Sequence, residues 1–270
     1  MLKVILSRLQ QKHRTIKFPD APPPALPERF RGRPCIDTSK CSDSCHKCSQ
    51  SCPTGAISVQ ENTVIDLGKC LFCTDCAEAC PNQSITFSSD YRLSFSKRKD
   101  LSISSGQKEL VLASALQDRI KKLFKRSLKL RQVSAGGCNS CEADVNVLNT
   151  VGWDLGRFGI QFVASPRHAD GILVTGPVTK NMKLALQKTY QAVPDPKIVI
   201  AVGTCAISGG IFAGHQECCG GVTDILPVDL FIPGCPPHPL TILDGLLRLL
   251  GKRDSKAEQG HTSPPEIARP

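Results

Sequence analysis

The chain has 270 residues, of which 40% are hydrophobic and 21% charged, so it is long enough for two globular domains. No stretch approaches the roughly 18 continuous apolar residues that a membrane-spanning helix needs. The net charge of +10 would suit an acidic partner, but no helix-turn-helix, zinc-finger or ribonucleoprotein motif accompanies it, so we expect no nucleic-acid partner. The 15 cysteines cluster at metal-ligand spacings, which argues against a disulfide framework. With no signal-peptide pattern visible, they predict a reducing, cytoplasmic setting.

Residues 1–34 are expected to form an N-terminal segment separate from the domains that follow. Leu2, Ile5, Leu6 and Leu9 recur at helical spacing, with basic side chains on the other faces, which predicts a basic amphipathic helix. Such a helix could lie on a membrane surface or dock on a partner subunit, and the sequence favours neither. The following "PDAPPPALP" predicts a stiff, extended spacer.

An internal repeat follows. "CSDSCHKCSQSCPTGAI" (41–57) recurs as "CLFCTDCAEACPNQSI" (70–85). The offset is 28 residues for the last three cysteines, the proline and the isoleucine, and 29 for the first cysteine. Two copies of one unit predict a small pseudo-symmetric domain.

The second copy is the C-x2-C-x2-C-x3-C-P run of bacterial ferredoxins, in which the fourth cysteine of each run reaches the other cluster. We therefore predict an α+β ferredoxin-like domain with two [4Fe–4S] clusters over residues 35–100. The first predicted ligand set is Cys41, Cys45, Cys48 and Cys80, and the second is Cys70, Cys73, Cys76 and Cys52. Two zinc sites are the alternative, but zinc usually takes paired cysteines rather than triplets closed by Cys-Pro. Cys35 is left over and is expected to be a bystander.

Residues 101–130 are expected to form a basic helical connector, because Ile120, Leu123, Phe124 and Leu128 share one helical face. Over residues 131–252, short apolar runs such as "GILVTG" and "KIVIAVG" alternate with helical stretches. This alternation indicates an α/β domain with a parallel, flavodoxin-like sheet. The tail, residues 253–270, has the composition of a disordered segment.

Four further cysteines predict a third site. In "VSAGGCNSCEADV", Cys138 and Cys141 stand where a helix should begin, so their side chains can face one point. Cys205 and Cys235 each follow a predicted strand. Because ligands gather at the carboxyl ends of the strands in an open parallel sheet, we predict a third [4Fe–4S] cluster on these four thiolates.

Two parts of the chain resemble subunits of known complexes. Four stretches, "RSLKLRQVSAGGCNSCEADV", "FGIQFVASPRHADGILVTGPVT", "PDPKIVIAVGTCAISGGIF" and "PVDLFIPGCPPHP", resemble the electron-transfer small subunit of membrane-bound group 4 [NiFe]-hydrogenases, in particular the formate hydrogenlyase type. That subunit is related to the 20 kDa subunit of respiratory complex I. Residues 30–100 resemble the two-cluster ferredoxin subunit of the same complexes, so we expect a fusion of the two.

The resemblance implies that Cys138, Cys141, Cys205 and Cys235 hold the cluster proximal to a large subunit. The C-x-x-C spacing favours the hydrogenase branch, because complex I uses adjacent cysteines for the first two ligands. Glu142 matches a glutamate implicated in proton transfer at the boundary between the two subunits. A carboxylate in the first turn of a helix is equally explained by the helix dipole.

The chain departs from the family pattern at two positions, and two cysteines lie outside it. Ser134 stands where many relatives carry aspartate and Ser140 where they carry glycine, and neither change removes a ligand. Cys218 and Cys219 match no ligand of the family.

The expected function is an electron relay, because the chain shows neither a nucleophile–base pair nor a glycine-rich phosphate loop. The resemblance implies partners: a large subunit with the nickel–iron site of reversible proton reduction, membrane ion-translocating subunits, and a ferredoxin or formate dehydrogenase module. It implies attachment to the inner face of the cell membrane through these partners. A nickel-free or complex I-like quinone oxidoreductase is one alternative. A cluster-based redox sensor is the other.

Overall fold

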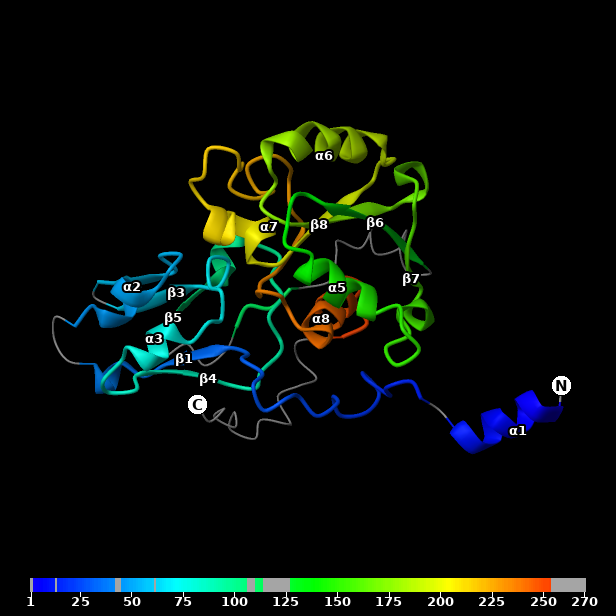
Figure 1. The fold of residues 1–270 in the computed structure, drawn as a ribbon, viewed down its shortest axis with the longest axis horizontal. Helices are drawn as coiled ribbons and strands as arrows, with labels where there is room; N and C mark the ends of the chain where they lie inside the picture. Colours follow the sequence, from blue (N-terminus) through cyan, green and yellow to red (C-terminus); the bar gives the residue numbers. More distant parts are fainter. Residues whose placement is uncertain are drawn as a thin grey trace.

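The computed structural model describes residues 2–12, 14–41, 45–60, 62–105, 110–113 and 127–253. Within these ranges the strands form a two-stranded, a three-stranded and a five-stranded sheet (Figure 1). Most of the expected connector helix and nearly all of the expected disordered tail lie outside the described residues. No helix of the described ranges combines the length and apolar character needed to cross a membrane.

The sequence repeat has a structural counterpart, because each copy gives a short helix followed by a strand. The first copy forms α2 (Lys47–Ser51) and β2 (Ile57–Val59). The second forms α3 (Asp75–Glu78) and β4 (Ile85–Phe87), and α2 packs against α3. The two copies therefore lie side by side, as expected for a pseudo-symmetric unit.

Short antiparallel pairs complete this half of the molecule. β4 pairs with β1 (Pro34–Ile36), and β2 pairs with β3 (Thr63–Asp66). β3 also pairs with β5 (Ser102–Ser104), which adds a third strand after the repeat has ended. The result is an α+β arrangement at one end of the molecule, on the left in Figure 1.

The five-stranded sheet is wholly parallel, with strand order β10-β9-β8-β6-β7. Its strands are β6 (Leu128–Ser134), β7 (Ile160–Phe162), β8 (Gly171–Thr175), β9 (Ile198–Val202) and β10 (Leu230–Ile232). Every residue of β8, β9 and β10 is buried, as the continuous apolar runs predict for a sheet covered on both faces. The prediction that Leu128 lies on a connector helix is wrong, because Leu128 begins β6.

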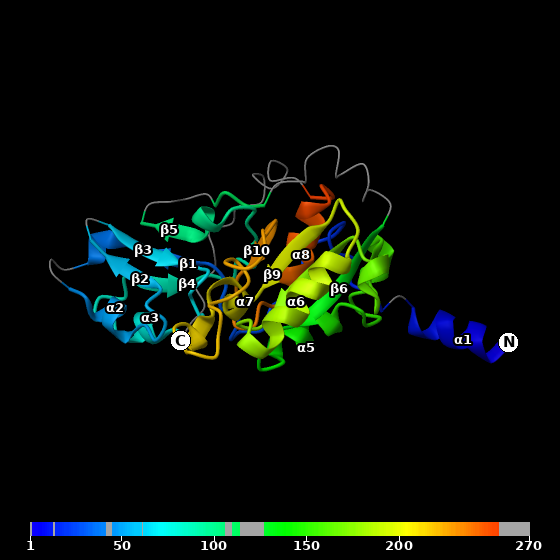
Figure 2. The ribbon, with the colours of Figure 1, turned by 90° about the horizontal axis from the view of Figure 1, so that it is seen from above.

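Helices cover both faces of the parallel sheet (Figure 2). They are α5 (Ser140–Val147), α6 (Lys180–Ala192), α7 (Thr204–Ser208) and α8 (Pro239–Leu249). Alternate residues of one strand point to opposite faces: Ile200 packs with the α5 and α8 side, and Ala201 with the α6 and α7 side. This covered parallel sheet is the predicted flavodoxin-like α/β architecture.

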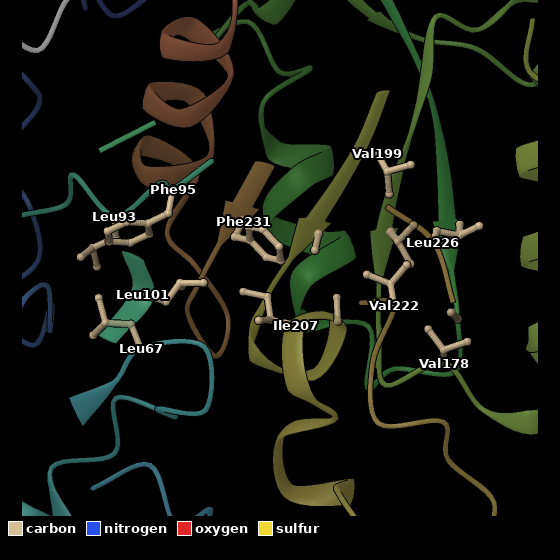
Figure 3. Close-up of a cluster of buried hydrophobic side chains, with 14 of the residues drawn as sticks. Leu67, Leu93, Phe95, Leu101, Val178, Val199, Ile207, Val222, Leu226 and Phe231 are labelled. Atoms are coloured by element: carbon tan, nitrogen blue, oxygen red, sulfur yellow. The ribbon is translucent and has the colours of Figure 1, made fainter. Parts of the chain in front are cut away.

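The two halves share one hydrophobic core. Leu67, Phe95 and Leu101 of the N-terminal half pack in the same cluster as Ile207 and Phe231 of the α/β half (Figure 3). Phe95 and Phe231 also exchange two backbone hydrogen bonds, at 3.0 and 2.8 Å. Each fully buried side chain of this kind contributes roughly 1.5–3 kcal/mol, so the contact holds the halves in a fixed relation.

The N-terminal helix α1 (Leu2–Gln11) stands apart from this core. None of its residues is buried, and it projects from the body at the end opposite the cysteine repeat (Figures 1 and 2). The chain first joins the body at Thr15 and Ile16, which hydrogen-bond to the carbonyl oxygens of Val151 and Gly152. Phe18 is then buried in the core on the α8 side of the sheet.

Candidate metal centres

The structure brings the four cysteines of the α/β half to the carboxyl edge of the parallel sheet. Cys138 lies in the loop after β6, and Cys141 in the first turn of α5. Cys205 lies in the first turn of α7, directly after β9, and Cys235 follows β10. Each strand therefore delivers its cysteine to the same edge, as parallel topology requires.

The electrostatics of these thiols show that they lie together. Burial raises the pKa of Cys141, and the charges of Glu142, Cys205, Cys235 and Cys138 raise it further. Burial also raises the pKa of Cys205 to about 11, with Cys235 and Cys138 as the next contributors. Such charge effects require proximity. A cluster bound here would have to displace protons from these thiols.

Two glycines make room for the sulfur atoms of this group. Gly203 has φ +89°, and a Cβ atom at this position would lie 2.5 Å from Cys141 Sγ. Gly210 has φ +55°, and its Cβ would lie 2.8 Å from Cys205 Sγ. Both contacts are too short for any side chain, so the motif "VGTCAISGG" needs glycine on each side of Cys205.

Cys138 is one of two exposed members of the group, with Cys235, and Ser140 adjusts its chemistry. The Cys138 Sγ and Ser140 Oγ atoms are hydrogen-bonded at 3.3 Å. This contact, with a second from the Ser140 backbone, lowers the pKa of Cys138 and so favours its thiolate. The serine that departs from the family pattern therefore supports a predicted ligand.

Glu142 is buried beneath this group, in the first turn of α5. Ser134 Oγ at the end of β6 and Thr175 Oγ1 at the end of β8 both donate to Glu142 Oε1, each at 2.6 Å. Two hydroxyl donors on one oxygen fix the carboxyl group in a single position. The sequence predicts Glu142 as a site residue, but it gives no sign of Thr175.

The first ferredoxin-type set lines one cavity. Cys41, Cys45, Cys48 and Cys80 border a space of about 400 Å³ between the first repeat and the start of β4. Burial raises the pKa of Cys48, and the charges of Cys80 and Cys41 add to that rise. The fourth cysteine of the second copy therefore lies beside the cysteines of the first copy, as the ferredoxin pattern predicts.

The second set is packed more tightly. Cys52, Cys70, Cys73 and Cys76 line a cavity of only about 10 Å³. Burial raises the pKa of Cys70 and of Cys76 to about 12 each. The charge of Cys52 raises the pKa of both, so this first-copy cysteine lies within the second-copy group.

Backbone N–H groups point at sulfur in both copies. Ala56 N donates to Cys52 Sγ and Ser84 N donates to Cys80 Sγ, each at 3.3 Å. These pairs occupy equivalent positions of the repeat, four residues after the fourth cysteine. Phe72 N donates to Cys70 Sγ at the same distance. Such N–H···S bonds stabilise thiolates and tune the potential of a bound cluster.

The donor chemistry of all three sets fits iron–sulfur clusters. Each set groups four thiols, the soft sulfur donors that such clusters take. Among the described residues, no three cysteine, histidine or acidic side chains form a group suited to a single metal ion. The assignment of individual cysteines to individual clusters stays a prediction.

A hydrogen-bonded contact joins the second set to the third, and nothing in the sequence predicts it. Thr204 Oγ1 donates to the carbonyl oxygen of Cys70 at 2.7 Å. One turn later, Ser208 Oγ donates to the carbonyl oxygen of Gly68 at 2.8 Å. The charge of Cys73 also acts on the thiol of Cys235.

The three remaining cysteines occupy different environments. Cys35 lies in β1, and burial raises its pKa. Cys219 donates its backbone N–H to Val178. Cys218 lies near the third group, because its charge acts on Cys205. No feature of the sequence spacing signals this proximity.

Two family matches cover the two halves. Residues 138–249 match the family described as NADH ubiquinone oxidoreductase, 20 Kd subunit, and residues 63–86 match a 4Fe-4S binding domain. A solved archaeal membrane-bound sulfane sulfur reductase aligns at 34% identity and a TM-score of 0.44, covering 50% of this chain and 75% of that one.

Individual relatives extend this comparison. Formate hydrogenlyase subunit 7 of Escherichia coli (strain K12) is 45% identical over 54% of this chain, which spans just over half, 56%, of that protein. The probable membrane-bound hydrogenase subunit mbhJ of Pyrococcus furiosus is 42% identical over 56% of this chain and 92% of its own length. An NADH-quinone oxidoreductase subunit of Heliobacterium modesticaldum is 37% identical over 58% of this chain and 92% of its length. This chain belongs to the family of the 20 kDa subunit of NADH ubiquinone oxidoreductase, and it carries a 4Fe-4S binding domain ahead of the family region.

Proposed function

We propose that the chain is the electron-transfer subunit of a membrane-associated [NiFe]-hydrogenase complex of the formate hydrogenlyase type, with three [4Fe–4S] clusters. The observation that carries this proposal is the grouping of twelve cysteines into three all-sulfur sets, two of which are tied together by the Thr204–Cys70 hydrogen bond. The relatives whose names include formate hydrogenlyase and membrane-bound hydrogenase support it.

The relay order follows from which sets are neighbours. The charge of Cys48 in the first set raises the pKa of Cys76 in the second. The charge of Cys73 in the second set likewise raises the pKa of Cys235 in the third. The second set therefore lies between the first and the third in the relay. When bound, each cluster supplies one reversible electron transfer. Electrons would enter or leave at the first set and reach the nickel–iron site of a large subunit from the third.

The residues of this chain hold and adjust that relay. The N–H donors at Cys52, Cys70 and Cys80 would adjust the potential of a bound cluster. Glu142, fixed by two hydroxyl donors beside the third set, would pass protons at the boundary with the large subunit. We assign residues 34–104, which end with β5, to the ferredoxin-like domain and residues 128–252, which begin with β6, to the family domain. Partner subunits would hold the chain at the inner face of the cell membrane.

Metal analysis of protein purified without oxygen tests the cluster proposal. We expect about twelve iron and twelve sulfide per chain and no stoichiometric zinc. Cys48→Ser, Cys73→Ser and Cys205→Ser should each lower the count by about four iron, because each removes a ligand from a different set. Cys219→Ser is the matched control and should leave the count unchanged. Stoichiometric zinc in place of iron would overturn the proposal.

A nickel-free, complex I-like quinone oxidoreductase is the second candidate. The similarity to the NADH-quinone oxidoreductase subunit of Heliobacterium modesticaldum, which extends over 92% of that relative, favours it. The two candidates differ in the large subunit rather than in this chain. Nickel in the intact complex, together with hydrogen evolution from a reduced dye, supports the hydrogenase. Quinone reduction by a complex without nickel supports the alternative.

A further inference from the structure

Helix α1 exposes an apolar stripe that no described part of the chain covers. Leu2, Ile5, Leu6 and Leu9 lie on one side of the helix, with exposures of 74%, 56%, 48% and 70%. All four stay exposed to water although burying an aliphatic side chain is favourable. A stripe of this kind is expected to be covered by something other than this chain.

Basic side chains border the stripe. At 3.6 residues per turn, Lys3 falls on one flank of the stripe and Arg8 on the other, while Ser7 and Gln11 lie on the far side. Positive charge continues beyond the helix at Lys12, Arg14 and Lys17, and the first acidic residue of the sequence is Asp20. A segment with five bases and no acid complements a negatively charged surface.

The attachment of α1 to the body keeps this stripe at the edge of the molecule. Thr15 Oγ1 donates to the carbonyl oxygen of Val151 at 3.1 Å, and Ile16 N donates to that of Gly152 at 2.8 Å. The side chain of Val151 is itself 72% exposed, so it adds apolar surface beside the anchor. The helix projects beyond this point in both views (Figures 1 and 2).

We propose that α1 lies flat on an anionic phospholipid surface, with Leu2, Ile5, Leu6 and Leu9 in the acyl boundary and Lys3 and Arg8 reaching the phosphate groups. The ten-residue helix is too short to span a bilayer, but its length suits binding in the plane of the interface. Long basic side chains on the two flanks keep their charges at the headgroups while their stems cover apolar surface. The uncovered far side, with Ser7 and Gln11, would face water.

Vesicle co-sedimentation of the full-length chain tests this proposal. Vesicles of phosphatidylcholine mixed with phosphatidylglycerol should bind the chain at least about tenfold more tightly than vesicles of pure phosphatidylcholine, and added salt should weaken this binding. Ile5→Gln combined with Leu9→Gln should lower the affinity for the mixed vesicles by about tenfold or more, because it removes two aliphatic anchors. Val4→Gln combined with Ser7→Gln is the matched control on the far side of the helix and should bind like the wild type.

Lys3→Gln combined with Arg8→Gln separates charge from apolar contact. It should weaken binding to the mixed vesicles by about thirtyfold and leave binding to pure phosphatidylcholine unchanged, since each of the two bases near an anionic surface is worth about 1 kcal/mol. Because α1 has no buried residue, these substitutions do not disturb the core. Equal binding to both kinds of vesicle, or equal affinity of the stripe and control variants, would overturn the proposal and leave a protein partner as the occupant. The iron content of the chain does not depend on vesicle binding. Failure of the membrane proposal is therefore distinct from failure of the proposed function.

Discussion

Thr204 Oγ1 lies 2.7 Å from the carbonyl oxygen of Cys70 and donates a hydrogen bond to it. Cys70 belongs to the second predicted ligand set, and Thr204 immediately precedes Cys205 of the third. A covalent and hydrogen-bonded route between the two sets therefore runs through this contact. The shared core around Phe95 and Phe231 keeps the two halves close enough for it to form.

Replacing Thr204 with valine should loosen this link. Valine keeps the shape of the side chain but leaves the Cys70 carbonyl without its donor, at a cost of about 1–3 kcal/mol in the free energy of unfolding. The magnetic interaction between the reduced second and third clusters should weaken, as measured by electron paramagnetic resonance. Thr204→Ser keeps the hydroxyl and should resemble the wild type in both measurements. If valine and serine gave the same spectrum, the hydrogen bond would have no part in coupling the clusters.

The sequence predicts the architecture of the chain better than its contacts. The buried strands β8, β9 and β10 show as apolar runs because both faces of the sheet are covered. Strand β6 is missed because its residues "LKLRQVS" mix apolar and basic side chains, and only three of its seven residues are buried. Apolar residues between basic ones at the end of a basic segment mimic a helical face, so the pattern places Leu128 on the wrong element.

In the candidate sites, too, the sequence predicts some features and not others. The positions of the twelve cysteines are predictable because the repeat and the strand ends fix them to particular loops. The hydroxyl groups of Thr175 and Thr204 are not, because their roles depend on which strand ends and loops meet in three dimensions. The proximity of Cys218 to Cys205 is hidden for the same reason.

Glu142→Gln tests whether the buried carboxyl group carries protons. Glutamine has nearly the same shape, and its carbonyl oxygen can still accept the hydrogen bonds of Ser134 and Thr175, so folding and iron content should not change. Hydrogen evolution by the intact complex should fall by about tenfold or more, the usual scale for losing an acid–base group. Ser134→Ala removes one donor but keeps the carboxyl group, and it should retain most of the activity. Full activity of the glutamine variant would assign Glu142 a purely structural role.

Gly203→Ala should damage the third set alone. The added methyl group would lie 2.5 Å from Cys141 Sγ, and alanine is strained at φ +89°. We expect a loss of about 1–3 kcal/mol in the free energy of unfolding and of about four iron per chain. Gly152→Ala is the matched control, because a methyl group there meets nothing within 4 Å. A Gly203→Ala protein with its full iron content would show that cluster binding does not need the close contact between the Gly203 backbone and Cys141 Sγ.

Asp229 should make the stability of the α/β half depend on pH. Burial raises the pKa of its carboxyl group, although the N–H of Val199, which donates to Oδ2 at 2.8 Å, lowers it in part. The folded chain therefore binds this proton more tightly than the unfolded chain does. Its contribution to stability is fully present below the ordinary aspartate pKa and is lost as the pH rises through the raised value.

Asp229→Asn removes this titration and keeps an oxygen that can accept from Val199. Urea unfolding under anaerobic conditions, repeated from acidic to neutral pH, should show a smaller decrease in stability with rising pH for the variant than for the wild type. At neutral pH the variant should be the more stable protein, because it no longer buries a charged carboxylate. Asp224→Asn alters an exposed carboxylate of the same half and serves as the control. Identical pH profiles for the Asp229 and Asp224 variants would mean that the strand-end carboxylate is not the source of the pH dependence.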